Sequence, residues 1–309
     1  MSSKNRLSPV AIFAFNRPEK LNSCLKSLEL AFDSELTSVF IFIDGPRSSQ
    51  EKSVVDEVES VAQQDWHFGE IQITRSPINL GLANSILRGI DSMFEDFEKV
   101  IVLEDDLEVS RNFLTYMNDG LLKYMHEEQV CSIQGYTYPN MQNQSRCFFL
   151  RGSDCWGWAT WKDRWSDFER DAKILHHAIL IRKLENLFDL NGKYPYLRML
   201  KDNQLGLNDS WAVRWHASNF VKNKLSLYPP NSLVTNTGDD GNGTHAGKTT
   251  GFRINLKNSE IGDLPEFIGE SVIARSKLIK FHAKRNRKYF LSRVKTALKL
   301  RLLVSKEHG

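Results

Sequence analysis

Four apolar residues run directly into three acidic ones at Val100-Ile101-Val102-Leu103-Glu104-Asp105-Asp106. A short β-branched run of this kind is typical of a buried strand in a parallel sheet. The acids then mark its carboxyl end, which is the edge where open α/β sheets bind their ligands. A divalent cation relieves the repulsion between neighbouring carboxylates, and both Mg²⁺ and Mn²⁺ prefer oxygen ligands. We therefore predict a cation site with Asp106 as the direct ligand, and with Glu104 and Asp105 facing a nucleotide or substrate.

A helix cap is the alternative explanation for these acids. Asp105 or Asp106 near a helix N-terminus would be stabilised by the helix dipole without any ligand. Three consecutive acids after a fully apolar strand exceed what a single cap requires. The cation site is therefore the interpretation that we carry forward.

The residues around this run predict alternating strands and helices. We expect strands at residues 10–15, 39–43, 71–73 and 100–103. Three helices are expected between them: one that starts at Pro18, one through residues 54–61 and one over residues 82–94. This order is typical of an α/β fold in which helices flank a doubly wound, mostly parallel sheet. Beyond Asp106 we expect a helix over 112–126 and a mixture of strand and loop over 130–149.

The composition is that of a soluble globular protein. Of the 309 residues, 41% are hydrophobic and 26% are charged, and we expect neither a membrane-spanning run nor a signal-peptide core. The four cysteines lack the paired spacing of a zinc or redox motif. Reduced thiols in a cytoplasmic protein are therefore the expectation.

The charge is distributed unevenly between the body and the C-terminus. Residues 271–309 hold 12 Lys and Arg against one acid, whereas residues 1–270 hold 29 against 37. Leu291, Val294, Leu298 and Leu302 recur at helical spacing between the basic residues, which predicts a basic amphipathic helix. We expect this helix to bind an anionic membrane surface, such as the inner face of the plasma membrane, and we expect no nucleic-acid role.

Two further residues follow predicted strands. Arg17 comes after the first strand and could contact phosphate or base through its guanidinium fork, or could simply lie at the surface. Asp44 ends the second strand in Asp44-Gly45-Pro46, which is also ordinary turn chemistry. Because two strand ends both present acids, a shared site in which Asp44 accepts hydrogen bonds from a base or ribose is reasonable.

Two residues of the C-terminal half are candidates for the chemistry. Asp209 precedes Ser210-Trp211 and could act as a general base, although a helix N-cap would explain an aspartate here as well. His245 lies in a glycine-rich segment over 238–247, which could bring it over a bound metal. An isolated histidine is more often structural or exposed.

Six of the seven tryptophans fall between residues 156 and 215. We expect at least half of them to lie in the core. Trp158 and Trp211 are the candidates for tryptophans outside the core, because an indole in a cleft could stack against a sugar ring.

One block resembles the metal-binding motif of the N-acetylglucosaminyltransferase I family, which is that family's version of DxD: Glu104-Asp105-Asp106-Leu107-Glu108-Val109, followed by Phe113 and Tyr116. Other segments match the same family in position and order: Asn16-Arg17 and Asp44 after the first two strands, Gly157-Trp158, Asp209 with Trp211, and Gly241–Gly247 with His245. The wider resemblance, over roughly residues 8–255, is to bacterial family-2-like glycosyltransferases of GT-A fold, which are often encoded with surface-polysaccharide genes.

The resemblance implies an inverting hexosyl- or N-acetylhexosaminyltransferase of surface polysaccharide biosynthesis. Its donor would be a nucleotide sugar, a UDP-sugar above all, and its acceptor a glycan or lipid-linked saccharide. The implied roles are nucleotide-sugar binding by Asn16, Arg17, Asp44, Glu104 and Asp105; Mn²⁺ or Mg²⁺ binding by Asp106 and His245; base catalysis by Asp209; and acceptor contacts by Trp158 and Trp211. The family has two acids before the tryptophan, where this chain has Asp209-Ser210.

The resemblance also implies a division of the chain. We expect a glycosyltransferase domain over residues 1–268, with a nucleotide-binding half at about 8–130 and an acceptor-side half at about 131–268. The basic tail would then cover residues 269–309.

Two other classes of protein remain open. A sugar nucleotidylyltransferase uses a related sheet and a metal, but its glycine-rich phosphate loop would replace Phe15-Asn16-Arg17-Pro18-Glu19, which has no glycine. A non-catalytic carbohydrate- or membrane-binding protein would explain the tryptophans and the basic tail, although not the acidic block.

Overall fold

The computed structural model describes residues 7–238, 251–256 and 261–286. Within these residues the larger sheet has eight strands in the order β3-β2-β1-β4-β8-β6-β9-β7. Strands β3, β2, β1, β4, β6 and β9 run in one direction, and β8 and β7 run in the other. The predicted α/β fold with a mostly parallel sheet is therefore confirmed.

The N-terminal half alternates strands and helices as expected. Its elements are β1 (Val10–Ala14), α1 (Pro18–Glu29), β2 (Ser38–Ile43), α2 (Lys52–Ala62), β3 (Glu70–Arg75), α3 (Leu82–Asp96) and β4 (Lys99–Glu104), with short 3₁₀ turns η2 (Ser34–Leu36) and η3 (Ser49–Glu51). Pro18 opens α1 because its missing N–H and fixed φ suit the first helical turn. Every residue of β1 is buried, whereas β3 at the sheet edge has none buried.

The chain changes character after β4. A second, two-stranded sheet pairs β5 (Leu107–Val109) with β10 (Val234–Asn236) in antiparallel fashion. The remaining elements are α4 (Phe113–Lys123), β6 (Val130–Gln134), η4 (Pro139–Met141), β7 (Phe148–Arg151), β8 (Trp158–Trp161), α5 (Lys162–Ser166), α6 (Ala172–Ile181), α7 (Glu185–Phe188), α8 (Tyr196–Gln204), α9 (Trp211–Val221) and β9 (Leu225–Tyr228). This half extends the sheet beyond β4 with strands of both directions.

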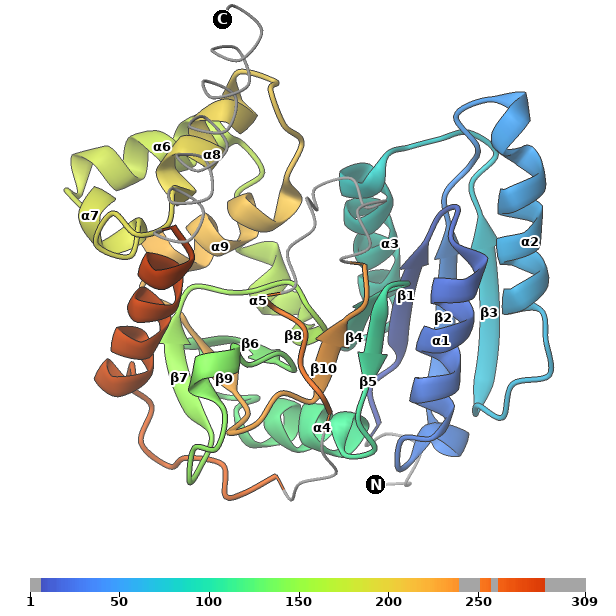
Figure 1. The fold of residues 1–309 in the computed structure, drawn as a ribbon, viewed down its shortest axis with the longest axis horizontal. Coiled ribbons are helices and arrows are strands. Elements are labelled where there is room, and N and C mark those ends of the chain that lie inside the picture. Colours follow the sequence, from blue (N-terminus) through green and yellow to red (C-terminus); the bar gives the residue numbers. More distant parts are fainter. Residues whose placement is uncertain (1–6, 239–250, 257–260, 287–309) are drawn as a thin grey trace, which may run out of the picture.

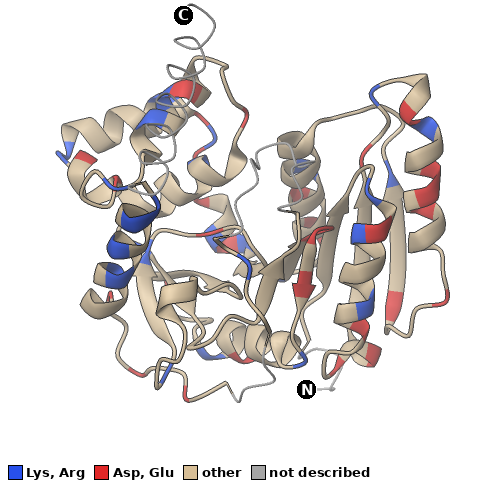
Figure 2. Cartoon of the chain, in the orientation of Figure 1, with Lys and Arg blue, Asp and Glu red and all other residues tan. Residues whose placement is uncertain are grey.

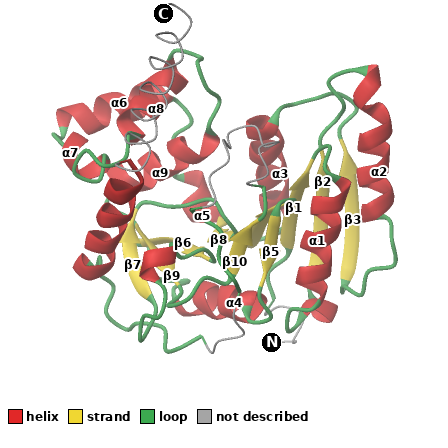
Figure 3. Ribbon diagram, in the orientation of Figure 1, coloured by secondary structure: helices red, strands yellow, loops and turns green. Residues whose placement is uncertain are grey.

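Helices cover both faces of the large sheet (Figure 3). Apolar residues of α1, α2 and α4 pack with those of β1 and β2 on one face. Residues of α3, α5 and α9 pack with β1, β4 and β8 on the other face. A smaller core joins α6, α7, α8 and α9, which gather beyond the carboxyl ends of the parallel strands (Figure 1). Helical residues therefore overhang the edge where ligands bind in such sheets.

A further helix over residues 272–286 packs against the body beside β7 (Figure 1). A parallel bridge joins Phe149 to Glu270, and the helix buries Ala274 and Leu278 in the main core. The described part of the predicted tail therefore belongs to the folded body, while the stripe from Leu291 to Leu302 lies outside the described residues. None of the described helices combines the length and the apolar character that a membrane crossing requires.

Candidate active site

The order of the large sheet reverses between β1 and β4, and the candidate site opens there. Strands β2 and β3 lie on one side of β1, and the chain returns to place β4 on the other side. Connections leave β1 and β4 in opposite directions at such a switch point, which creates a crevice at their carboxyl ends. Arg17 follows β1 and the acids follow β4, so both groups lie at this crevice.

Arg17 joins the two strand ends by ion pairs. Its Nη1 lies 3.1 Å from Asp106 Oδ2, and its Nη2 donates to Asp105 Oδ1. The side chain of Asp105 is 3% exposed, while that of Asp106 is 13% exposed. Asp105 also accepts a backbone hydrogen bond from Phe15, so it fixes the turn after β1 and holds Arg17.

The three acids differ in their surroundings. Desolvation, together with the neighbouring carboxylates of Asp106 and Asp105, raises the pKa of Glu104 to about 8. Desolvation, with a smaller contribution from Asp106, raises the pKa of Asp105 to about 7 against the opposing charge of Arg17. Glu104 accepts no hydrogen bond from any described residue, and the nearby charge of Arg17 offsets the rise in its pKa only in part.

Glu104 and Asp106 line a cavity of about 520 Å³. This volume falls within the range of small-molecule sites. We call one set of its lining residues the acidic end: Arg17, Glu104, Asp106, Asn236 and Gly238. We call another set the aromatic end: Tyr138, Asp154, Trp156, Tyr194, Tyr196, Phe252, His282 and Arg285. Residues 208–213, before and within the first turn of α9, form a further part of the wall.

Strand β10 supports the backbone of Asp106 from the second sheet. Thr237 donates to the Asp106 carbonyl from its N–H, at 2.8 Å, and from its hydroxyl, at 3.0 Å. Asn236 Nδ2 lies 3.4 Å from Asp106 Oδ1, and a side chain at Gly238 would collide with the Asp106 carboxylate. The sequence analysis missed this support because the pairing of β5 with β10 joins segments that are distant in the chain.

The acidic end suits a divalent cation whose ligands come partly from the protein and partly from a bound substrate. Among the described residues no three His, Cys, Asp or Glu side chains are arranged to hold a metal by themselves. Mg²⁺ is usually bound by one or two carboxylates together with substrate phosphates rather than by an all-protein cage. Glu104 and Asp106 provide two such carboxyl groups on the cavity wall, and a bound cation would favour the ionised form of Glu104. His245 lies outside the described residues.

Asp44 lies at the predicted carboxyl end of β2, but its side chain holds a turn. It is 4% exposed, and its two oxygens accept from the backbone N–H groups of Gly45, Leu80 and Gly81 and from the Asn79 side chain, at 2.8–3.0 Å. Both oxygens are therefore used to hold the turn that precedes α3. This is a correction to the prediction that Asp44 meets the nucleoside directly, because its hydrogen-bonding capacity is already occupied. Asn16, also expected at the nucleotide, hydrogen-bonds to Glu51.

Asp209 is an exposed residue of the cavity wall rather than a helix cap. The N-cap of α9 is Ser210, whose hydroxyl accepts from the N–H of Val213 at 3.4 Å. The Asp209 carboxylate accepts no hydrogen bond from the described residues, and its charge acts on the nearby Arg214. Ser210, and not Asp209, therefore fills the helix-cap role that was considered for Asp209.

The tryptophans divide between core and cavity. Trp158 is 0% exposed and stacks on Trp211, with ring centroids 5.7 Å apart. It lies on a central strand between the sheet and α9, so it has no face open to an acceptor, which corrects the predicted contact. Trp211 lines the cavity but is only 3% exposed, whereas the half-buried Trp156 also lines it at the aromatic end.

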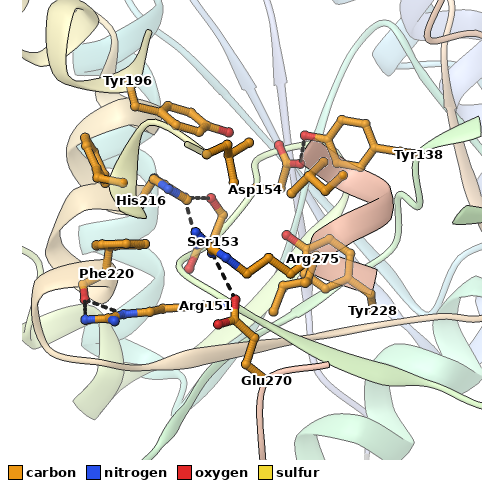
Figure 4. A pocket seen from close by; sticks show the side chains of 14 residues that line it. Tyr138, Arg151, Ser153, Asp154, Tyr196, His216, Phe220, Tyr228, Glu270 and Arg275 are labelled. Atoms are coloured by element: carbon orange, nitrogen blue, oxygen red, sulfur yellow. Dashed lines mark hydrogen bonds and ion pairs between the residues drawn. The ribbon is translucent and has the colours of Figure 1, made fainter. Parts of the chain in front are cut away.

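The aromatic end contains a buried polar pair that the sequence analysis did not find. Tyr138 donates its hydroxyl proton to Asp154 at 2.7 Å (Figure 4). Desolvation raises the pKa of Asp154, and the hydrogen bond from Tyr138 opposes that shift. A small cavity of about 20 Å³ lies behind this pair and is also lined by His216 and Arg275. The sequence feature that could have indicated this pair is Asp154, an acid just before the tryptophan-rich segment.

One known protein family matches more than half of the chain. Residues 10–176 match the family model described as Glycosyl transferase family 2. Among solved structures, a crystal structure of S. aureus TarS 1-349 is 13% identical, with a TM-score of 0.29 over 47% of this chain and 41% of that one. A second S. aureus TarS structure is 11% identical, with a TM-score of 0.28 over 44% and 24%. The chain thus spans less than half of either structure. Comparison with proteins of curated function gives no significant match.

Proposed function

The chain belongs to glycosyl transferase family 2, whose model matches more than half of its residues, and is a glycosyltransferase of GT-A fold. We propose that it moves a sugar from a nucleoside diphosphate sugar to a saccharide hydroxyl, with inversion and with the help of Mn²⁺ or Mg²⁺. The observation that carries this proposal is the cavity that brings Arg17, Glu104 and Asp106 together with the exposed carboxylate of Asp209.

The acidic end is the proposed donor site. Glu104 and Asp106 would hold the divalent cation, which when bound neutralises negative charge on the diphosphate leaving group. Arg17 would contact a phosphate oxygen through its guanidinium fork while Asp105 fixes its position. Asp44 would act indirectly, by fixing the turn before α3. We retain a UDP-sugar as the proposed donor and His245 as a further cation ligand.

Asp209 is the proposed general base. Its carboxylate would accept the proton of the acceptor hydroxyl as that oxygen forms a bond to the anomeric carbon. The bond from the anomeric carbon to the diphosphate oxygen breaks on the opposite face, and the nucleoside diphosphate leaves with the electron pair. An exposed carboxylate on the cavity wall, free of the capping role, suits this step.

Residues 287–309 are the proposed membrane contact. They carry seven Lys and Arg and one acid, with leucines at helical spacing, which suits an anionic membrane surface near a lipid-linked acceptor of polysaccharide synthesis. Deleting residues 287–309 should abolish binding to vesicles that contain anionic lipid. The truncation must spare residues 272–286, because they pack in the body. Undiminished vesicle binding by the truncated chain would contradict this part of the proposal.

A nucleotide-sugar screen tests the proposed function. With Mn²⁺ present, the correct donor at 100 times its Kd should stabilise the protein by about 2.7 kcal/mol, which raises Tm by several degrees. The same donor without a divalent cation should give a much smaller shift. Product analysis then separates the reaction classes: release of nucleoside diphosphate supports sugar transfer, and release of pyrophosphate would show a nucleotidylyltransferase instead.

A further inference from the structure

The helix over residues 272–286 lies beyond the residues that match the family model, yet it forms part of the cavity wall. The match ends at residue 176, whereas His282 and Arg285 line the cavity at the aromatic end. Figure 2 shows basic bands and no acidic ones along this helix. The helix therefore adds positive charge to the wall of a cavity whose acidic end is formed by the family-matched half.

Hydrogen bonds at both ends hold this helix on the body. Near its start, the N–H of Ser271 donates to Phe149 O at 2.8 Å, and Arg275 bonds to both Glu270 (3.2 Å) and Leu187 O (2.7 Å). At its other end, Asn286 Nδ2 donates to Lys193 O at 2.7 Å. Figure 4 shows Glu270 and Arg275 beside the small cavity behind the aromatic end. The helix is thus anchored to the sheet edge and to the helical overhang, so its cavity residues have defined positions.

His282, a residue of this wall, has a buried nitrogen without a partner among the described residues. The residue is 2% exposed, and its Nε2 has no hydrogen-bond partner among the described residues. Its ring lies against Tyr194 and Tyr138, with centroid distances of 4.5 and 5.7 Å. Burial lowers the pKa of His282 to about 4, so the ring is neutral at physiological pH. A buried polar atom without a partner is costly, and a bound hydroxyl would satisfy it.

Arg285 presents an unpaired cation beside it. Its guanidinium lies over the ring of Phe252, 4.4 Å from the centroid, and forms no ion pair or hydrogen bond with the described residues. The nearby carboxylate of Asp154 instead accepts from Tyr138. A half-buried guanidinium in a cavity wall offers a planar fork that matches a phosphate or a carboxylate.

We propose that His282 and Arg285 form an acceptor subsite for a saccharide that carries a phosphate or carboxylate group. Arg285 binds the anionic group, His282 Nε2 hydrogen-bonds to a sugar hydroxyl, and the surrounding rings pack on the apolar faces of the sugar. This subsite rests on the proposed function, because it assumes that the donor diphosphate occupies the acidic end. The acidic end already has Arg17 for the diphosphate, and Cys155 lies near Asp154 as well as near Glu104 and Asp106.

Matched sugar pairs test the subsite with the full chain, UDP and Mn²⁺. The panel contains glucose, galactose, mannose and N-acetylglucosamine, each beside its 6-phosphate, and the uronic acids of the first three. Calorimetry should show that at least one acidic sugar binds about tenfold more tightly than its neutral partner, equivalent to about 1.4 kcal/mol. Arg285→Gln should abolish that preference, whereas Lys284→Gln removes the same charge from an exposed position on the helix and should preserve it. His282→Phe keeps the ring packing and should weaken acidic and neutral sugars by the same factor.

The outcomes separate this proposal from the one on which it rests. If UDP with Mn²⁺ does not bind to the unmodified chain, the proposed function fails, and the subsite fails with it. If UDP binds but no acidic sugar is preferred, or Arg285→Gln keeps the preference, the subsite alone is overturned. Weaker UDP binding in Arg285→Gln would also overturn it, because Arg285 would then belong to the donor. Comparison of the 6-phosphates with the uronic acids identifies which anionic group is bound.

Discussion

The charged residues of the acidic end, Arg17, Glu104 and Asp106, lie at the carboxyl ends of two neighbouring parallel strands, whereas the aromatic end comes from loops and helices far apart in the chain. Arg17 and Asp106 are brought together by the pairing of β1 with β4. Arg285 joins Tyr138 and Asp154 because the helix over 272–286 folds back on the body. The family match covers all of the first set except the support from β10, and it ends before the returning helix.

This difference assigns different tasks to the two ends. A switch point in a doubly wound sheet is a general consequence of its topology, so it suits a ligand group that many related enzymes share, such as a diphosphate. Side chains on distant loops and helices can change without disturbing the sheet, so they suit the part of the ligand that differs between enzymes. We therefore expect substitutions at the acidic end to affect donor and cation, and those at the aromatic end to affect acceptor choice.

Asp209→Asn should give the largest effect, because it removes the proposed base. We expect kcat to fall by about 10²- to 10⁴-fold, the range of general-base catalysis, while the Kd of the donor is unchanged. Steady-state kinetics and donor calorimetry measure the two quantities. Asp202→Asn is the matched control, since Asp202 lies on α8, outside the cavity wall, and pairs only weakly with Arg198 at 3.7 Å. An equal loss of donor affinity in Asp209→Asn would give this residue a role in the donor site instead.

Trp158→Ala should lower stability by about 3–5 kcal/mol, because it empties a core position between the sheet and α9. Trp156→Ala removes a half-buried ring of the cavity wall and should cost less stability but raise the KM of the acceptor. Urea denaturation and acceptor kinetics distinguish these effects. A raised acceptor KM in Trp158→Phe, at nearly unchanged stability, would show that Trp158 contributes to acceptor binding.

Asp106→Asn tests the acidic end. Loss of the carboxylate should weaken cation binding and lower kcat/KM by roughly 10²- to 10³-fold, since a metal contributes several kcal/mol to transition-state stabilisation. Kinetics across a range of Mn²⁺ concentrations measure the loss. Glu108→Gln removes a nearby charge on β5 that does not line the cavity, and it should keep most of the activity. Unaltered Mn²⁺ dependence in Asp106→Asn would exclude Asp106 as a ligand.

The acidic end could be predicted from the sequence because local patterns determine it. An apolar run followed by acids indicates both a buried strand and its carboxyl end, and the order of strands and helices places Arg17 beside it. Asp44 has the same kind of position, but its role depends on the turn at residues 79–81 folding back onto it. No local sequence pattern indicates that contact. A direct contact with the nucleoside was therefore predicted, whereas in the structure Asp44 holds a turn.

The aromatic end could not be predicted because tertiary packing decides which side chains reach it. Trp156 and Trp158 are two positions apart and differ mainly in that β8 lies between β4 and β6, which buries Trp158. His282 and Arg285 fall in a basic stretch whose composition favours a surface tail. Their place in the cavity follows from Ala274 and Leu278 packing in the main core, a contact that charge patterning does not reveal.

The buried His216 predicts the smallest effect, a loss of stability in mild acid. His216 lies on α9 behind the aromatic end, with Nδ1 2.9 Å from Ser153 O, and burial lowers its pKa to about 4. In the unfolded chain its pKa returns to about 6.5, so the unfolded state takes up the proton first as the pH falls. This contribution to stability is complete above about pH 6.5 and is lost as the pH falls toward 4. At pH 5.5 the loss from His216 should be about 1.4 kcal/mol relative to pH 7.5, and His282, whose pKa is also lowered to about 4, adds to the total.

Urea denaturation at the two pH values measures this difference. His216→Gln should reduce it by about that amount, whereas His126→Gln, at an exposed position, should leave it nearly unchanged. If His216→Gln keeps the full pH dependence, the ring must already be protonated in the folded protein. That result would place a positive charge behind Asp154, so the aromatic end would have a second cation besides Arg285 and its contrast with the acidic end would be sharper.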